Sequence, residues 1–241
     1  MPEYEKKLQE IEYSLSMIKG WTDIRNEFAL LKMEGLWQMS EYDSLLTVYR
    51  TIKDESQEHK LRKHSWQCLA LYERNDDFHG KMSQLGKEAD QALKDYRKKK
   101  FENISAISFA YYTLGYVSYH QKNADQKAFQ QTLDYFKKAY ETDIINQNFY
   151  NLATDLYYIA SAFQKLGDYK NAAWHFERAS FIYAQNKETD KSEYAFYYSL
   201  KNKYFFEKKE TLLSQIKELK QNTQNPELKI RINEWMENPD K

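Results

Sequence analysis

The side chains of this sequence that could do acid–base or metal chemistry are five histidines: His59, His64, His79, His120 and His175. Two histidines hold a zinc ion from one helical face when they are spaced as in an HExxH motif, four residues apart. His59 and His64 are five apart, and the sequence has no HExxH and no CxxC pair. The spacing of these residues therefore predicts no metal centre.

Nucleophilic and phosphate-binding motifs are missing as well. Cys68 is the only cysteine and lies in the apolar run 66–71, which predicts a buried small hydrophobe rather than a nucleophile. No GxSxG, GxGxxG or GxxxxGK[ST] motif occurs. We therefore expect no enzyme and no cofactor, although acidic residues assembled only by folding keep an enzyme on a helical scaffold as an alternative.

The charges balance, with 36 Lys and Arg against 36 Asp and Glu. Zero net charge argues against direct nucleic-acid binding, which needs a clustered positive surface. The sharpest basic run is 97–100. It is typical of a last helical turn, where cations complement the helix dipole, and an anion or nucleic-acid contact is the alternative.

Nothing in the sequence predicts a membrane or an oxidising compartment. The N-terminal residues MPEYEKKLQEIEY are charged and contain no apolar signal core, and no stretch approaches the roughly 20 apolar residues of a membrane span. A single cysteine cannot form a disulfide framework within one chain. We expect a soluble cytoplasmic protein without membrane contact, whose oligomeric state stays open.

Composition predicts the elements that must position any functional side chain. Only three prolines occur, Pro2, Pro226 and Pro239, together with only six glycines. Because a β-rich chain needs more turn residues and helices exclude proline, this favours an all-α protein. Aromatic residues make up 16% of the chain, which indicates a packed rather than a disordered protein.

Residues 153–184 carry the clearest pattern, that of two antiparallel helices. Small residues (Ala160, Ala172 and Ala179) and large ones fall where the two helices would touch, and the turn Leu166-Gly167-Asp168-Tyr169 separates them. The large residues are Leu156, Ile159, Phe163, Tyr169 and Phe176. Apolar periodicity predicts further helices over 3–19, 23–39, 44–52, 64–72, 82–96, 105–121, 129–140, 188–206, 212–219 and 228–236. Turns are predicted at 40–43, 75–78 and 208–211, with a break at 222–226.

The segment 153–184 resembles a tetratricopeptide (TPR) repeat, and 105–140 is similar at its helices, with a longer connector. Segment 31–52 has the same helix–turn–helix form, with Ser40 in place of the turn glycine. The resemblance implies a right-handed superhelical solenoid of antiparallel helix pairs, ending in a C-terminal capping helix at 228–236. We expect a degenerate TPR-like region over 1–100 and TPR repeats with the cap over 101–241.

A narrower resemblance is to the Rap-type and Rgg-type regulators, bacterial TPR proteins that bind short signalling peptides. The order of segments from Ala106 to Trp235 is similar to their C-terminal part, without a helix-turn-helix DNA-binding module ahead of the repeats. This family often holds the peptide backbone with asparagines, where this sequence has Tyr157, Tyr158 and Ser161.

The TPR resemblance also implies which residues face a concave groove, because the first helix of each pair lines it. We expect a peptide or protein segment to contact Phe109, Tyr112, Thr113, Tyr116, Tyr119, His120, Tyr157, Tyr158, Ser161, Lys165, Tyr198 and Asn202, with Thr154 and Ser199 among them. Tyrosine combines an apolar face with a polar tip, which suits recognition of peptides. Packing between repeats is the alternative role of each tyrosine.

Two functions follow as hypotheses besides the enzyme. The first is a non-catalytic scaffold that captures a peptide or protein segment in an aromatic-lined groove. The second is a Rap- or Rgg-type regulator that a short signalling peptide switches between shapes.

Overall fold

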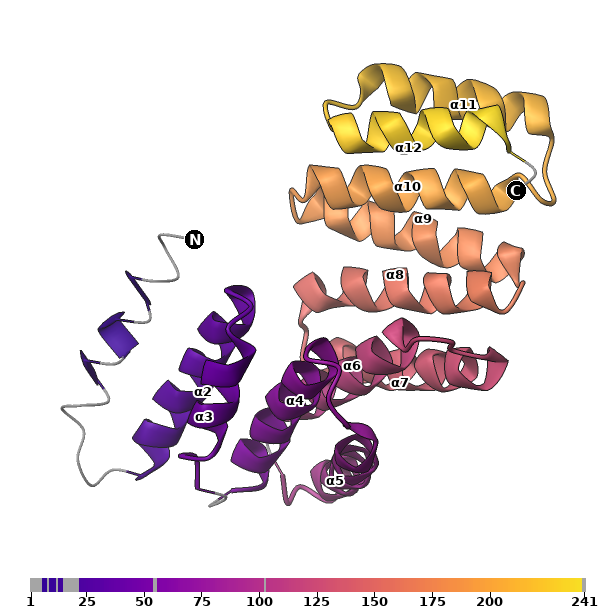
Figure 1. The fold of residues 1–241 in the computed structure, drawn as a ribbon. Helices are drawn as coiled ribbons and strands as arrows, with labels where there is room; N and C mark the ends of the chain where they lie inside the picture. Colours follow the sequence, from indigo (N-terminus) through magenta and orange to yellow (C-terminus); the bar gives the residue numbers. More distant parts are fainter. Residues whose placement is uncertain are drawn as a thin grey trace. The chain divides into compact units, whose positions relative to one another are not determined.

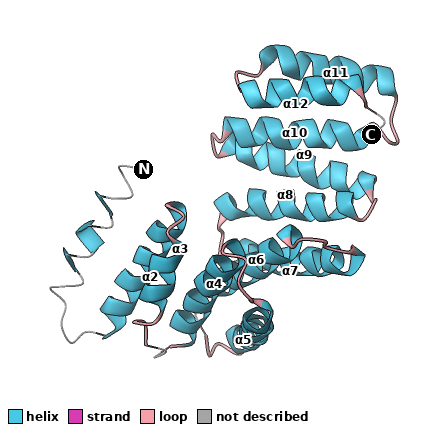
Figure 2. Cartoon of the chain, viewed as in Figure 1, coloured by secondary structure: helices cyan, strands magenta, loops and turns pink. Residues whose placement is uncertain are grey.

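The structure, a computed structural model, describes residues 6, 7, 9–11, 13, 14, 22–53, 56–101 and 103–239. Over these residues the chain forms helices and turns and contains no strand, which confirms the all-α class (Figure 1, Figure 2). The helices are α2 (Thr22–Gln38), α3 (Tyr42–Tyr49), α4 (Gln57–Glu73), α5 (His79–Arg97), α6 (Ile104–His120), α7 (Gln126–Ile145), α8 (Phe149–Lys165), α9 (Tyr169–Gln185), α10 (Thr189–Lys203), α11 (Lys209–Asn222) and α12 (Pro226–Glu237). Of the helix expected over 3–19, Leu8, Leu15 and Ile18 lie outside the described residues.

The chain divides into two compact units, Met1–Gln121 and Lys122–Lys241. Helix α6 therefore belongs to the first unit, whereas the boundary expected from the sequence, at 100/101, assigns it to the second. Each unit has its own core.

In the first unit, α4 packs against α2, α3, α5 and α6, and α5 also packs against α6. One core cluster is built from Leu30 and Met33 of α2, Leu45 of α3 and Ala70 of α4, all buried. A polar contact ties α2 to α4: Glu27 of α2 accepts hydrogen bonds from Arg62 at 2.9 and 2.7 Å.

In the second unit, each helix from α7 to α12 packs against the next one. In Figure 1, α8, α9 and α10 follow one another as layers, whereas α12 is drawn between α10 and α11. Alanines lie where α8, α9 and α10 meet, and Ala153, Ala160, Ala172, Ala179 and Ala195 are all fully buried. Small side chains let these helices approach closely, so the sequence expectation for this hairpin is confirmed. The C-terminal helices share a core of their own, made from Tyr197, Leu200, Tyr204, Leu212, Ile216, Leu228, Ile232 and Trp235.

Most turns between helices share one backbone conformation. After α8, Gly167 has φ +81°, its amide donates to the carbonyl of Gln164, and the amide of Asp168 donates to the carbonyl of Phe163, which is a Schellman motif. The same pair of backbone bonds recurs at five non-glycine residues with φ between 55° and 62°: Ser40, Asn75, Lys99, Gln147 and Lys187. Ser40 therefore takes the place of the turn glycine, as the sequence predicts.

One predicted turn is wrong. The turn expected at 208–211 lies earlier, because α10 ends at Lys203 and α11 begins at Lys209. Phe205 and Phe206, which the sequence pattern assigns to a helix, are turn residues with exposed rings. Apolar periodicity cannot distinguish a buried ring from an exposed one, and no glycine or proline marks this turn.

Candidate binding surface

Helix α8 is buried around most of its circumference and leaves two tyrosines half-buried, Tyr157 and Tyr158. Leu156, Ile159 and Ala160 pack inward, so the positions next to them stay partly open. The Tyr158 ring stacks on Phe136 of α7, with centroids 4.7 Å apart and planes at 4°. These two tyrosines are therefore partly exposed, and the packing of α8 against its neighbours fixes their positions.

From Tyr157 a series of ring contacts crosses the second unit, which we call the aromatic ladder. Its members are Tyr157 of α8, Phe176 of α9, Tyr198 and Tyr197 of α10, Trp235 of α12, and Tyr204, which directly follows α10. Tyr157 meets Phe176 at 5.2 Å, Phe176 meets Tyr198 at 5.4 Å, and Tyr198 meets Tyr197 at 5.3 Å. Trp235 then contacts Tyr197 at 6.5 Å and Tyr204 at 5.1 Å. Tyr157 and Tyr198, both half-buried, give the ladder its accessible face.

A second set of rings lies in the first unit, and we call it the aromatic row. It consists of Trp37, Trp66, Tyr72, Phe109, Tyr112 and Tyr116, all half-buried. Trp66 of α4 contacts Trp37 at 6.1 Å and Phe109 at 4.7 Å. Tyr116 contacts Tyr112 and Tyr72, each at 6.2 Å. Three of the residues predicted to contact a peptide, Phe109, Tyr112 and Tyr116 of α6, thus belong to this row.

Tyr116 is a hydrogen-bond donor at this face. Its hydroxyl donates to Glu73 Oε1 at 3.4 Å, and burial together with the charge of Glu73 raises the pKa of Tyr116 to about 12. The hydroxyl therefore keeps its proton at neutral pH. Tyr119 is half-buried and contacts His120, which ends α6 and is exposed.

The remaining predicted residues lie in different surroundings. Thr113, Ser161, Ser199 and Asn202 are buried, and Ser161 and Asn202 each donate to a carbonyl of their own helix. Ser199 donates to the carbonyl of Ala173, and Thr154 accepts from the Tyr183 hydroxyl. Lys165 is exposed at the end of α8.

Sequence reasoning missed several rings of the aromatic row and of the aromatic ladder. Trp37, Trp66 and Tyr72 lie within residues 1–100, where the sequence pattern is weak, and Trp235 lies on α12. The only available signal was that Trp66 and Tyr72 belong to the apolar run 64–72, which reads equally well as core.

The cysteine and histidine side chains that could take part in chemistry make packing contacts instead. The predicted burial of Cys68 is confirmed, and burial raises the pKa of its thiol to about 12. His64 Nδ1 lies 2.6 Å from Glu88 Oε2, and His175 stacks on Phe163 at 5.5 Å. Burial and the charges of Arg178 and Lys137 lower the pKa of His175 to about 4, so this imidazole is neutral. Among the described residues, no three His, Cys, Asp or Glu side chains gather where they could hold a metal ion.

One buried acidic pair lies between α7 and α8. Asp143 and Asp155 are each 1% exposed, and neither oxygen of Asp155 has a hydrogen-bond partner of good geometry in the described part of the chain. Burial, followed by the charge of Asp143, raises the pKa of Asp155 well above its usual range. Asp155 therefore holds its proton to a higher pH than a solvated aspartate does.

No protein-family model and no curated protein matches this sequence. Over the described residues, no helix has both the length and the apolar character needed to cross a lipid bilayer.

Proposed function

We propose that this protein is a non-catalytic scaffold that captures a peptide or protein segment on its half-buried aromatic rings. The scaffold we propose is a TPR-like solenoid of antiparallel helix pairs with a right-handed superhelical path, closed by α12 as a cap. The observation that carries the proposal is the aromatic ladder, in which Tyr157 and Tyr198 stay accessible while their ring partners hold them in place.

Rigid tyrosines suit this role because they offer a large contact area and lose little side-chain entropy on binding. The rings of Tyr157 and Tyr198 are held by contacts with Phe176, so most of the ordering cost is met in the free protein. The aromatic row supplies a second surface of the same kind, with Tyr116 as a polar tip.

The test uses a displayed library of random short peptides, selected on immobilised protein and then measured in solution by fluorescence polarisation. Tyr116→Ala, Tyr157→Ala and Tyr198→Ala each remove one ring. A selected peptide contacts one of these rings, and we expect the variant that lacks this ring to bind the peptide about 30-fold more weakly. One aromatic anchor contributes about 2 kcal/mol.

Phe181→Ala is the matched control, because Phe181 is 66% exposed on α9 and lies outside the ladder. Circular dichroism must show unchanged helicity for every variant. Peptides that bind all variants as tightly as the wild type, or a library that yields no binder, would contradict the proposal.

The regulator of the Rap or Rgg kind is tested by the same protein used as bait in spent culture medium. Oligopeptides bound to the wild type and lost from Tyr157→Ala would support peptide sensing. Recovery of none under any growth condition would count against it.

A further inference from the structure

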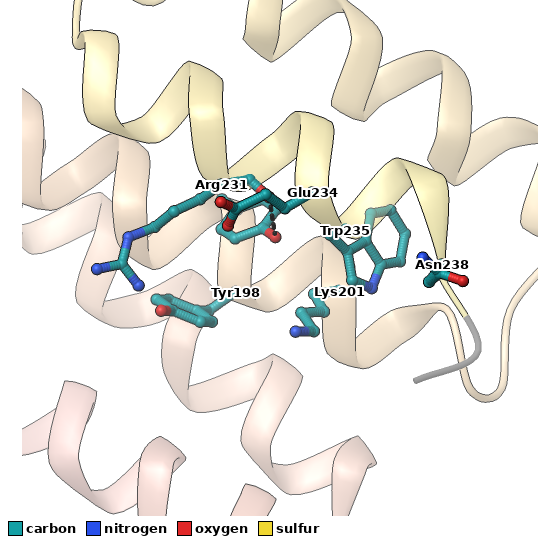
Figure 3. A pocket seen from close by; sticks show the side chains of 7 residues that line it. Tyr198, Lys201, Arg231, Glu234, Trp235 and Asn238 are labelled. Carbon is teal, nitrogen blue, oxygen red and sulfur yellow. Dashed lines mark hydrogen bonds between the residues drawn. The ribbon is translucent and has the colours of Figure 1, made fainter.

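A pocket of about 350 Å³ opens between α10 and α12 in the second unit (Figure 3). Its volume lies at the lower end of the range found for small-molecule sites. It is lined by Tyr197, Tyr198, Lys201, Arg231, Glu234, Trp235 and Asn238.

Aromatic rings form the apolar wall of this pocket. Tyr197 and Trp235 meet nearly at right angles, with centroids 6.5 Å apart, and Tyr198 lies 5.3 Å from Tyr197. The Tyr197 hydroxyl donates to the carbonyl of Arg231 at 3.3 Å, which fixes its ring against α12. The wall is therefore rigid and suits a flat, apolar body.

Two hydrogen-bond donors of the pocket have no acceptor. Trp235 is 6% exposed, and its buried Nε1–H has no partner in the described part of the chain. Lys201 is half-buried and makes no hydrogen bond or ion pair with any described residue, and burial lowers its pKa. In Figure 3 the indole nitrogen of Trp235 and the Lys201 side chain lie on the same side of α12. A buried donor without an acceptor carries a desolvation cost that a ligand oxygen would remove.

The charges around the pocket favour a single negative charge. Arg231 is already paired with Glu227 at 3.0 Å, so Lys201 is the cation without a carboxylate partner. Glu234, the acidic lining residue, is exposed, so water screens its repulsion of an anion. A dianion would meet that repulsion twice while still having only one unpaired cation to contact.

We propose that this pocket binds a small organic monoanion, a carboxylate on a flat apolar body. The carboxylate accepts from Lys201 Nζ and Trp235 Nε1, and the body lies against Tyr197 and Tyr198. This site needs no peptide, so it is independent of the proposed scaffold function, although Tyr197, Tyr198 and Trp235 also belong to the aromatic ladder.

The test compares benzoate with benzyl alcohol, which has a similar shape and no charge, using ligand-observed NMR on the full chain. We expect saturable benzoate binding with a Kd on the order of 1 mM, and binding of benzyl alcohol at least about 10-fold weaker. Inorganic phosphate should compete poorly, because it lacks the apolar body.

Variants locate the binding. Lys201→Met keeps the aliphatic stem and should weaken benzoate about 10-fold, and Trp235→Phe keeps the ring and should weaken it about 5-fold. Lys203→Met is the matched control, because Lys203 lies on the same helix and pairs with Glu177 at 2.8 Å outside the pocket. Helicity by circular dichroism reports whether each variant folds.

Four results would overturn the proposal. They are equal binding of benzoate and benzyl alcohol, unchanged benzoate affinity in folded Lys201→Met, no saturable binding below about 10 mM, or competition by phosphate as strong as that by benzoate.

Discussion

Tyr157 of α8 and Tyr198 of α10 meet edge to face, with ring centroids 6.1 Å apart, and both contact Phe176 of α9. Three consecutive helices are thus joined through the same rings that we propose bind a partner. Under this proposal, helix packing and partner recognition use the same side chains, so a substitution at either tyrosine affects both.

The contact between Tyr157 and Tyr198 should appear as an energetic coupling. In a double-mutant cycle with Tyr157→Ala and Tyr198→Ala, we expect an interaction free energy of about 1 kcal/mol, typical of edge-to-face pairs beyond their buried area. Urea unfolding of the four proteins measures it. The pair Tyr157→Ala and Phe181→Ala is the control and should be additive within about 0.5 kcal/mol, and equal coupling in both cycles would contradict the prediction.

Asp155 should make the folded second unit lose stability as pH rises. Its pKa is raised in the folded state, so that state binds more protons than the unfolded chain above the unfolded pKa of about 3.9. The free energy of unfolding therefore falls from that pH up to the folded pKa, by at most about 1.4 kcal/mol per pH unit.

Asp155→Asn removes this titration while keeping the shape of the side chain. We expect the variant to be more stable than the wild type at pH 8 and to show a smaller difference at pH 5, measured by urea unfolding at both values. Asp134→Asn, an exposed change on α7, should leave the pH dependence as it is. A wild-type curve that rises between pH 5 and 8 in step with the Asp155→Asn curve would count against a raised pKa of Asp155.

Glu88 should have the opposite effect in the first unit. Burial opposes its ionisation, but hydrogen bonds from His64 at 2.6 Å and Gln84 at 3.0 Å hold its pKa below the usual value. The folded state then binds fewer protons, so this stabilisation is present above the unfolded pKa of about 4.3 and is lost as pH falls through the folded pKa.

Glu88→Gln should cost about 0.5 to 1 kcal/mol at pH 7, a value reduced by the solvent that screens this partly exposed carboxylate. The loss should shrink below pH 4, where the wild-type carboxylate is protonated as well. Thermal unfolding across this range measures it, with the exposed Glu34→Gln on α2 as the control. A loss that stays constant with pH would point to packing instead.

Gly167 should matter through its backbone angle alone. A methyl group at this position would meet nothing within 4 Å, but φ is +81°, where L-residues are strained. We expect Gly167→Ala to cost about 1 kcal/mol and Lys187→Gly, at φ 62°, to gain up to about 1 kcal/mol. Gly80→Ala, also free of contacts but without a positive φ, should be neutral or stabilising, and a loss there equal to that at Gly167 would contradict this explanation.

The helices could be predicted from the sequence because alanine spacing and the absence of proline act locally. Tyr157, Tyr158 and Tyr198 follow from the same pattern, since residues next to buried positions on a helix stay partly open. The pocket could not be predicted, because Lys201 and Trp235 are 34 positions apart and meet only when α12 folds back onto α10. Burial of Ser161 and Asn202 was also hidden, because polar residues that bond to their own helix carry no signal of depth in the sequence.

The left-handed residue after each of α2, α4, α5, α7, α8 and α9 also bears on how the protein is made. Its two backbone bonds join atoms at most five positions apart, so a helix can terminate as soon as its last turn leaves the ribosome. Reversal of the chain direction needs no distant segment at these points. The helical hairpins can therefore form one after another during synthesis, because each new helix can pack against the helix made before it.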